Sequence, residues 1–529
     1  MLLSNSRSEG CNDVVRTKAK EIDHLTIKFV VGLIAVSLAP LVGHNGGILL
    51  QRQRFSRLTP SLGSVLPFDS GFPELKRWAI LAKVRMNLTD GQDAKEADTS
   101  LVPGPDNAWH PIARVAFRFA FVYFGLYIVT TQMFWSGLLP AADLNPLANL
   151  PPLRYAISWV ARHLFGVTAP LVIEGSGSGD KIFDWAHVCL LLALATGVTV
   201  IWSILDRRRK SYRSLHEWFR IGVRLGLGTT MLSYGAAKAV PLQMGYGPSL
   251  TRLVEPFGSF SPMGVLWTFM GSSPAYQSFT GCTEILGGVL LLIPQTALLG
   301  ALISFAVSFQ IFVLNMTYDV PVKLLSFHLV LLSLFLILPD WPRLRNFFLL
   351  NRTVAPAQDR VTRSPRRSKV LLSLQLCFAL YVTLSLAYGA KQGWFEFGGG
   401  APKPPLYGIW NVDQMQFGDQ VRPPLVTDDQ RWRRVIFDRP GRAVFQKMDD
   451  SLVVFAAKID PEGETIELTK TDDKNWKATL SFARPAPDRL TLNGAMDGNQ
   501  LVIDLRLDRE QFLVLNRGFH WVQERPFNR

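Results

Sequence analysis

The stretch LNMTYDVPVKLLSFHLVLL, residues 314–332, has the apolar character of a membrane segment but also holds polar and charged side chains. They are Asn315, Tyr318, Asp319, Lys323 and His328. Charged groups at membrane depth cost free energy unless they are paired or face a cavity. The stretch therefore predicts a bundle of membrane helices in which polar groups of several helices meet each other.

The rest of the chain supports a multipass helical protein. Its 529 residues are 48% hydrophobic, and the apolar residues gather in runs of about 20, the length needed to cross a bilayer. Seven apolar helices are predicted, near 113–139, 184–205, 217–241, 276–293, 296–316, 320–338 and 370–390. Between the first two, LRYAISWVARHLFG (153–166) alternates apolar and basic residues at helical spacing, which is typical of a helix lying on a membrane surface.

The distribution of basic residues predicts the orientation. The net charge is +14, and basic residues cluster in the short loops DRRRK (206–210) and RVTRSPRRSK (360–369), as in cytoplasmic loops of membrane proteins. No motif indicates nucleic-acid binding. Counting helices from these loops places residues 391–529 outside. We therefore expect a multipass protein of the bacterial cytoplasmic (inner) membrane, with the lipid bilayer as a partner and the C-terminal domain in the periplasm.

The C-terminal part has a different sequence period. After the linker FGGGAPKPP (397–405) come short alternating segments such as WKATLSF and QLVIDLRL, separated by turn residues. They predict a small antiparallel β-barrel or sandwich. A barrel of about eight strands accommodates either one small ligand or a filled core, and both alternatives stay open. Trp410, near the first strand, is expected to close one end.

The predicted fold class is an α-helical multipass membrane bundle of about seven helices followed by a small antiparallel β-barrel or sandwich domain. For residues 1–111 we predict a poorly ordered N-terminal region. It contains either an additional helix at 27–50 or a mis-assigned start with the true start at Met86. The remaining predicted parts are two transmembrane helices with an outer loop (112–216), a four-helix unit (217–340), a basic cytoplasmic loop (341–369), a transmembrane helix (370–390), a linker (391–403) and the periplasmic β-domain (404–529).

Four of the predicted helices carry polar groups at overlapping depths in the outer half of the bilayer. Glu284 and His328 lie deepest, and they are the candidate catalytic residues. The alternative is that they form a satisfied strut that orients the helices. Tyr234 and Lys238 are four residues apart and share one helix face. The candidate ligand-binding residues are Tyr234, Lys238, Gln310, Asn315 and Lys323.

Asp319 is expected to have a structural role. It precedes Pro321 at the predicted start of a helix, where a carboxylate caps free N–H groups, and it lies four residues before Lys323. Lys323 is near the membrane interface, and its alternative role is to extend its ammonium group into water.

No metal site is predicted. The cysteines Cys11, Cys189, Cys282 and Cys377 form no CxxC pair. His520 and Glu524 are four residues apart, but no third ligand accompanies them.

Three segments resemble the DoxX family of four-helix membrane proteins. They are RLGLGTTMLSYGAAKAVPLQ, FTGCTEILGGVLLLIPQTALLGALIS and LNMTYDVPVKLLSFHLVLLSLFLILPD, within about 217–340. The family takes its name from a subunit of a thiosulfate:quinone oxidoreductase, so the resemblance implies membrane electron transfer around a quinone. The chain departs from the minimal family plan, because it has two additional helices before this unit, one after it, and an outer β-domain.

The leading hypothesis is a redox-associated component that binds a quinone or similar lipid-soluble carrier. Lys238 and His328 would donate hydrogen bonds, Glu284 would carry the proton and Gln310 would orient the ring. A protein partner would have to supply electrons. The alternatives are a non-enzymatic protein that binds or transfers a lipid, with a ligand-binding barrel, or a scaffold or assembly factor whose buried charges only fix helix pairing.

Overall fold

The computed structural model describes residues 108–138, 150–171, 180–354, 365–470, 473, 475–508 and 512–528. The expected helix at 27–50 and the expected start at Met86 lie outside these residues. Backbone contacts divide the chain into two compact units. One holds helix α4 up to Tyr123 together with residues 194–219, and the other holds residues 124–193 and everything from Arg220 onward.

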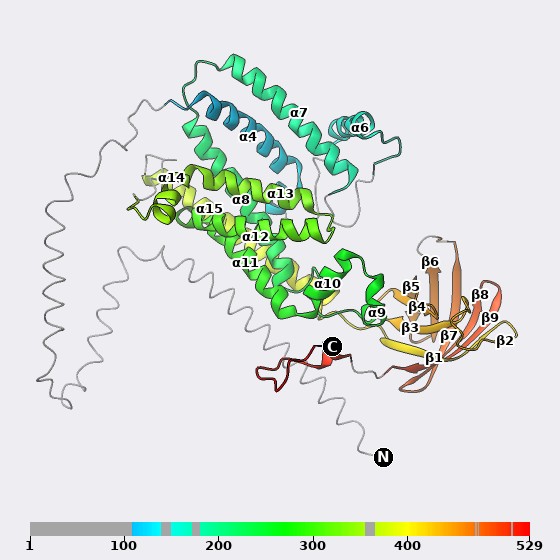
Figure 1. Cartoon of the computed structure of the whole chain (residues 1–529). Helices are drawn as coiled ribbons and strands as arrows, with labels where there is room; N and C mark the ends of the chain where they lie inside the picture. The colour runs from blue at the N-terminus through cyan, green and yellow to red at the C-terminus, as the bar shows by residue number, and fades with distance from the viewer. Residues whose placement is uncertain are drawn as a thin grey trace, which may run out of the picture. The chain divides into compact units, whose positions relative to one another are not determined.

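The helices of the described part agree with the predicted bundle (Figure 1). Each of the seven expected apolar segments contains a helix, and shorter helices lie between them. Their bounds are α4 Pro111–Thr130, α5 Gln132–Leu138, α6 Pro151–Phe165, α7 Ile182–Leu205, α8 Arg213–Ala239, α9 Leu250–Val254, α10 Pro262–Ser272, α11 Pro274–Leu292, α12 Ala297–Thr317, α13 Lys323–Ile337, α14 Trp341–Leu344, α15 Pro365–Glu396 and α16 Leu513–Asn516.

Five helical segments are long and apolar enough to cross a membrane, judged by length and composition. They are Pro111–Thr130, Ile182–Leu205, Pro294–Thr317, Lys323–Leu349 and Lys369–Glu396. The predicted helices now seen as α8 and α11 are not among them. Both carry buried polar side chains on one face, including Lys238 and Glu284, and these lower their apolar character.

Local sequence explains where α10 and α11 begin. The Ser261 hydroxyl accepts a hydrogen bond from the Gly264 N–H, and Pro262 occupies the first turn of α10. Ser273 and Pro274 repeat this arrangement at the start of α11. Serine caps the free N–H groups of a first turn, and proline costs nothing there because its missing N–H has no helical partner.

Glycines allow α8, α11 and α12 to pack closely. A Cβ atom at Gly281 would lie 2.5 Å from the Gly235 carbonyl oxygen of α8, and one at Gly288 would lie 2.8 Å from the Gly228 carbonyl oxygen. A Cβ atom at Gly300 of α12 would lie 2.5 Å from the Leu291 nitrogen. Backbones in contact through small residues are typical of membrane helix pairs, where van der Waals packing replaces the hydrophobic effect.

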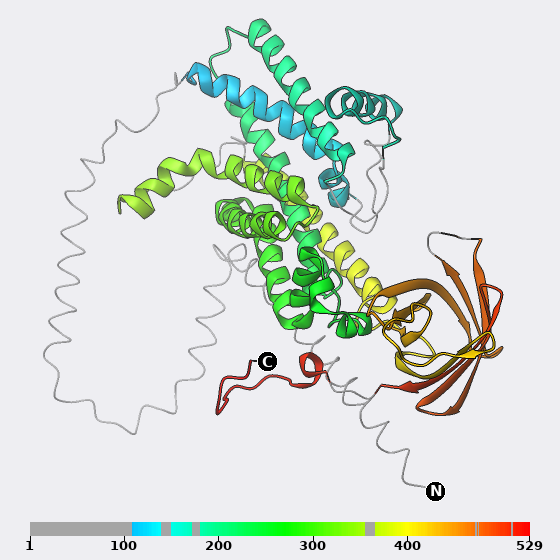
Figure 2. The same ribbon diagram turned by 45° about the vertical axis from the view of Figure 1, so that its right-hand side comes forward.

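The C-terminal domain is a closed antiparallel barrel of eight strands, with the short β2 added to β1 (Figure 2). The strands follow one another around the barrel in chain order, and β1 also pairs with β9, so Trp410 lies opposite both Val435 and Leu507. The strand bounds are β1 Gly408–Phe417, β2 Gln420–Val421, β3 Trp432–Phe437, β4 Arg442–Lys447, β5 Leu452–Asp460, β6 Thr465–Lys470, β7 Lys477–Ala486, β8 Arg489–Met496 and β9 Asn499–Leu507.

Side chains fill the interior of the barrel. Trp410 is almost completely buried, and its indole N–H donates to the Leu406 carbonyl oxygen at 2.9 Å. Trp432 stacks on Phe445 with 4.2 Å between the ring centroids, and Phe455 packs against Phe445 at 5.0 Å. Aliphatic residues from every strand of the closed ring complete this core. Of the two alternatives for the barrel, the structure therefore favours the filled core.

The glycine contacts generate a stability prediction. Gly281→Ala places a methyl group against the backbone of α8, and overpacking of this kind costs about 1–3 kcal/mol of unfolding free energy. Gly222→Ala is the matched control on α8, because no atom lies within 4 Å of a Cβ built there. We expect thermal unfolding in detergent to show a lowered Tm for Gly281→Ala and an unchanged or raised Tm for Gly222→Ala. Equal effects of the two substitutions would contradict the close contact.

Candidate functional site

The centre of the candidate site is an ion pair between α8 and α11. The Lys238 ammonium lies 2.8 Å from Oε1 and 3.0 Å from Oε2 of Glu284. Their side chains are 9% and 2% exposed. Lys238 lies one turn beyond Gly235, and Glu284 lies one turn beyond Gly281, so the closest approach of the two backbones lies next to the two charges.

Tyr234 extends this pair toward α5. The Lys238 ammonium lies 5.6 Å from the centroid of the Tyr234 ring, within the range of a cation–π contact. The Tyr234 hydroxyl accepts a hydrogen bond of 2.8 Å from the Gln132 side-chain amide. The shared face predicted for Tyr234 and Lys238 is thus present. Sequence reasoning missed Gln132, which is 102 residues away from Tyr234.

His328 is buried and belongs to a second polar group. Its ring stacks on Tyr127 of α4, with 3.8 Å between the centroids and 5° between the planes. His328 Nδ1 lies 2.6 Å from the Leu324 carbonyl oxygen. Because a carbonyl only accepts, Nδ1 is the ring nitrogen that carries a proton in this contact.

Another histidine lies close to this stack along α4. Thr130 of α4 has its hydroxyl oxygen 3.1 Å from Nε2 of His187, on α7. Thr130 is three residues beyond Tyr127, so the two contacts lie one helical turn apart. Tyr127 and His187 lie in predicted apolar runs, where nothing in the sequence distinguishes a buried polar contact from a side chain that faces lipid.

The start of α13 corrects the predicted role of Asp319. The N–H groups of Lys323 and Leu324 donate to the carboxylate of Asp180, at 2.7 and 2.9 Å. Asp180 is therefore the cap of this helix. Asp319 instead points outward, with 82% of its side chain exposed, and its carboxylate lies 2.9 Å from the Lys323 ammonium. The chain turns through Asp319 with a positive φ of 51°, which carries its side chain away from the helix start.

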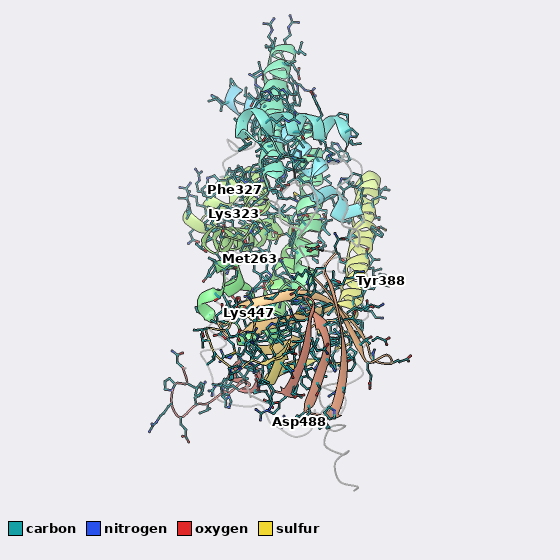
Figure 3. The ribbon with its side chains drawn as sticks, turned by 90° about the vertical axis from the view of Figure 1, so that its right-hand side faces the viewer. Met263, Lys323, Phe327, Tyr388, Lys447 and Asp488 are labelled. Atoms are coloured by element: carbon teal, nitrogen blue, oxygen red, sulfur yellow. The ribbon has the colours of Figure 1, made fainter. Side chains whose placement is uncertain are left out.

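Lys323 forms ion pairs with carboxylates outside the Lys238–Glu284 pair. Its ammonium is 3.8 Å from Asp180 as well as close to Asp319. Figure 3 shows Lys323 and Phe327 at neighbouring positions of α13. Since the side chain is a quarter exposed, these contacts fit the alternative of an ammonium group near the interface.

Asn315 and Gln310 differ from the expectation of a shared pocket. Asn315 is buried, but its amide donates to the Ser326 hydroxyl at 3.0 Å and to the Val322 carbonyl oxygen at 3.3 Å, so it fixes the turn between α12 and α13. Gln310 is exposed on α12. Ser308 occupies the buried face two residues earlier. Helical periodicity puts residues 308 and 310 on different faces, and the polar group alone did not show which face is buried.

The site therefore combines a buried acid–base pair with hydrogen-bonding aromatic groups. The ammonium of Lys238 is a hydrogen-bond donor, the carboxylate of Glu284 is a proton acceptor, and the Tyr234 hydroxyl both donates and accepts. In lipid, such groups are stable when they pair with one another, and paired ionisable residues of this kind are candidates for a ligand or proton site.

The ion pair generates a double-mutant prediction. Lys238→Met or Glu284→Gln alone leaves one partner buried without its counter-charge, which we expect to cost about 3–5 kcal/mol of stability. The double variant removes both charges and is expected to regain most of this loss. Thermal unfolding of the wild type, the two single variants and the double variant in detergent measures the coupling free energy between the two side chains. Additive losses in the double variant would show that the two side chains do not depend on each other.

The helix cap generates a further prediction. Asp180→Asn weakens the two N–H contacts at the start of α13, and loss of such a cap costs about 0.5–2 kcal/mol. Asp319→Asn removes only an exposed ion pair, for which about 0–1 kcal/mol is expected. The shift in Tm should therefore be larger for Asp180→Asn. A larger shift for Asp319→Asn would return the capping role to that residue.

These features define a class of protein: a membrane-embedded helical protein with several spans and a C-terminal antiparallel β-barrel. Within this class the chain belongs to the family of the uncharacterized protein YwoB of Bacillus subtilis (strain 168). The two are 37% identical over 125 residues, which are 24% of this chain and 79% of YwoB. No family model matches the chain, so the resemblance to DoxX proteins gains no support from that comparison. No solved structure matches it either.

Proposed function

We propose that the protein binds the polar head of a lipid-soluble carrier, for which a quinone is the best chemical match, and that it acts as a redox-associated component. The observation that carries this proposal is the Lys238–Glu284 pair, buried between α8 and α11 beside Tyr234. A charged pair at this depth costs free energy that an apolar pair would not, and such residues inside membrane segments commonly mark a ligand or proton path.

The chemistry of a quinone fits these groups. Reduction adds two electrons and two protons, one proton to each carbonyl oxygen. Under this proposal Lys238, now paired with Glu284, donates a hydrogen bond to one carbonyl, and Glu284 accepts or returns a proton. The electrons come from a partner protein under this proposal. The resemblance of residues 217–340 to DoxX proteins points to the same ligand class.

The stacked rings of His328 and Tyr127 are a second group that supports the proposal. His328 and Tyr127 form a flat stack, and the contact of His328 Nδ1 with Leu324 holds the imidazole in one orientation. Under this proposal the ring presents Nε2 to the carrier in a fixed orientation. Gln310 has no part in the revised site, because it lies exposed on α12.

The orientation remains part of the proposal. We propose that the protein lies in a bacterial cytoplasmic membrane with the barrel in the periplasm, because the basic loops 206–210 and 360–369 favour the cytoplasmic side. Together with this topology, we propose the domain limits that were predicted from the sequence.

The structure disfavours one of the two alternative functions and agrees with the other. Lipid transfer by the barrel is disfavoured, because its interior is occupied by Trp410, Phe445 and other buried side chains. A scaffold role has one specific observation in its favour: Lys238 and Glu284 satisfy each other without a ligand. The test must therefore separate a structural pair from a binding pair.

Bound small molecules provide that test. The wild type, Glu284→Gln and the Lys238→Met, Glu284→Gln double variant are purified in detergent, extracted with solvent and compared by mass spectrometry. Gln310→Ala is the matched control, since it removes an exposed polar group from the same bundle. We expect a carrier to co-purify with the wild type and with Gln310→Ala. It should be at least about tenfold depleted in the other two, equal to about 1.4 kcal/mol of binding free energy.

The double variant makes the result decisive. If it regains stability but lacks the carrier, the pair has a binding role beyond its structural one. If no carrier is found in any sample, or if the folded double variant retains it, the binding proposal fails and a scaffold role is favoured.

A further inference from the structure

The C-terminal loop, residues 517–528, exposes an unusual group of large apolar side chains. It follows the short helix α16 after the barrel. Phe519, Trp521 and Val522 are 83%, 88% and 81% exposed. Such a cluster on the water-facing part of a protein marks a binding surface, because each of these side chains gains free energy when it leaves water.

Internal contacts hold the loop in a compact shape. The Arg517 guanidinium lies 3.9 Å from the centroid of the Phe527 ring and donates to the Gln523 side-chain oxygen at 3.0 Å. Gly518 reverses the chain with a φ of 71°, and the Phe519 and Trp521 rings are 6.0 Å apart, edge to face. The base of the loop is thus closed by Arg517, and the apolar side chains project from it.

The stem of the loop contacts the connection between α8 and α10. Phe512 packs against the cluster of Ile409, Ile436 and Val444 that also contains Leu250 and Val254 of α9. A Cβ atom at Gly247 would lie 3.9 Å from Leu515 Cδ2. The loop therefore begins beside the connection that follows α8.

The same connection has the side chains of a membrane interface. Phe257, just after α9, and Phe269 of α10 are 73% and 60% exposed. Exposed Trp and Phe side chains suit the boundary between the headgroups and the acyl chains of a bilayer. The C-terminal loop continues this pattern, and its Arg517 and Arg525 outnumber its one acidic residue, Glu524.

We propose that the C-terminal loop is a membrane anchor for the barrel: Phe519, Trp521 and Val522 insert into the bilayer interface, and Arg517 and Arg525 contact the phosphates of anionic lipids. The proposal is independent of the carrier. Aromatic and arginine side chains also suit a protein partner, but the contact of the stem with the membrane bundle favours the bilayer. The anchor would hold the barrel at the membrane through a second attachment besides α15.

Spin-label accessibility in the full-length protein tests the anchor. Val522→Cys is labelled after the native cysteines, Cys11, Cys189, Cys282 and Cys377, are replaced by serine. Val426→Cys is the matched control, an equally simple substitution at an exposed valine in the turn after β2. Both are reconstituted in phosphatidylcholine nanodiscs, with and without phosphatidylglycerol. Collision rates with oxygen, which enters lipid, and with a water-soluble nickel complex are then measured.

We expect the label at 522 to collide several-fold more with oxygen than with nickel, and the label at 426 to show the reverse. Adding Phe519→Ser and Trp521→Ser should return the label at 522 to the aqueous pattern. Replacing both arginines, Arg517→Gln together with Arg525→Gln, should remove the response to phosphatidylglycerol. A label at 522 that stays nickel-accessible in both bilayers overturns the proposal, and so does one shielded from both reagents, which would indicate that the loop packs against the protein itself.

Discussion

The absence of water in the bilayer is the constraint on which the bundle depends. Polar groups placed there lose their hydration and must find partners within the protein. Lys238 and Glu284 meet this requirement with an ammonium that lies within 3.0 Å of both carboxylate oxygens. Gly235 and Gly281 bring the backbones of α8 and α11 into contact one turn before the two charges. Close helix packing and the ion pair therefore lie at the same place along α8 and α11.

The same constraint organises the end of α8 and the start of α11. Gln277, on the face of α11 that also holds Gly281 and Glu284, accepts from the Met244 N–H and donates to the Gly245 carbonyl oxygen. Ser278 donates to the Ala239 carbonyl oxygen at the end of α8. The chain leaving α8 is thus held against α11 by side chains that satisfy its backbone. The position of the connection to α9 is fixed by the helix pair that carries the charges.

The sequence predicted the features that depend on short-range patterns of residues. Apolar runs located the helices, the period of two located the strands, and the four-residue spacing placed Tyr234 and Lys238 on one face. It did not predict contacts between distant segments, such as Asp180 with the N–H groups of Lys323 and Leu324, 143 and 144 residues away. Asp319 was the nearest carboxylate along the chain, and proximity in sequence favoured it wrongly. Gln310 was misplaced for a related reason, because depth along a helix does not determine the buried face.

The barrel shows how a domain with a filled interior still makes specific contacts. Ile409, Ile436 and Val444 are buried although their strand neighbours Trp410, Val435 and Phe445 already point into the core. Successive side chains of a strand point to opposite faces, so consecutive buried residues require a covering on the outside of the barrel. Leu250 and Val254 of α9 provide it, and Thr251 donates to Asp438 at 2.6 Å beside them.

The apolar runs GIW, VIF and AVF in β1, β3 and β4 already contained this information, because strict alternation would leave every second residue in water. Those three strands are neighbours in the sheet, so their outward apolar residues form one continuous patch. A barrel whose interior is filled by its own side chains recognises other groups through its outer surface. In this protein the outward patch packs against α9, in the segment that follows α8. The barrel is therefore connected to α8, which carries one partner of the buried ion pair, both along the chain and through this contact.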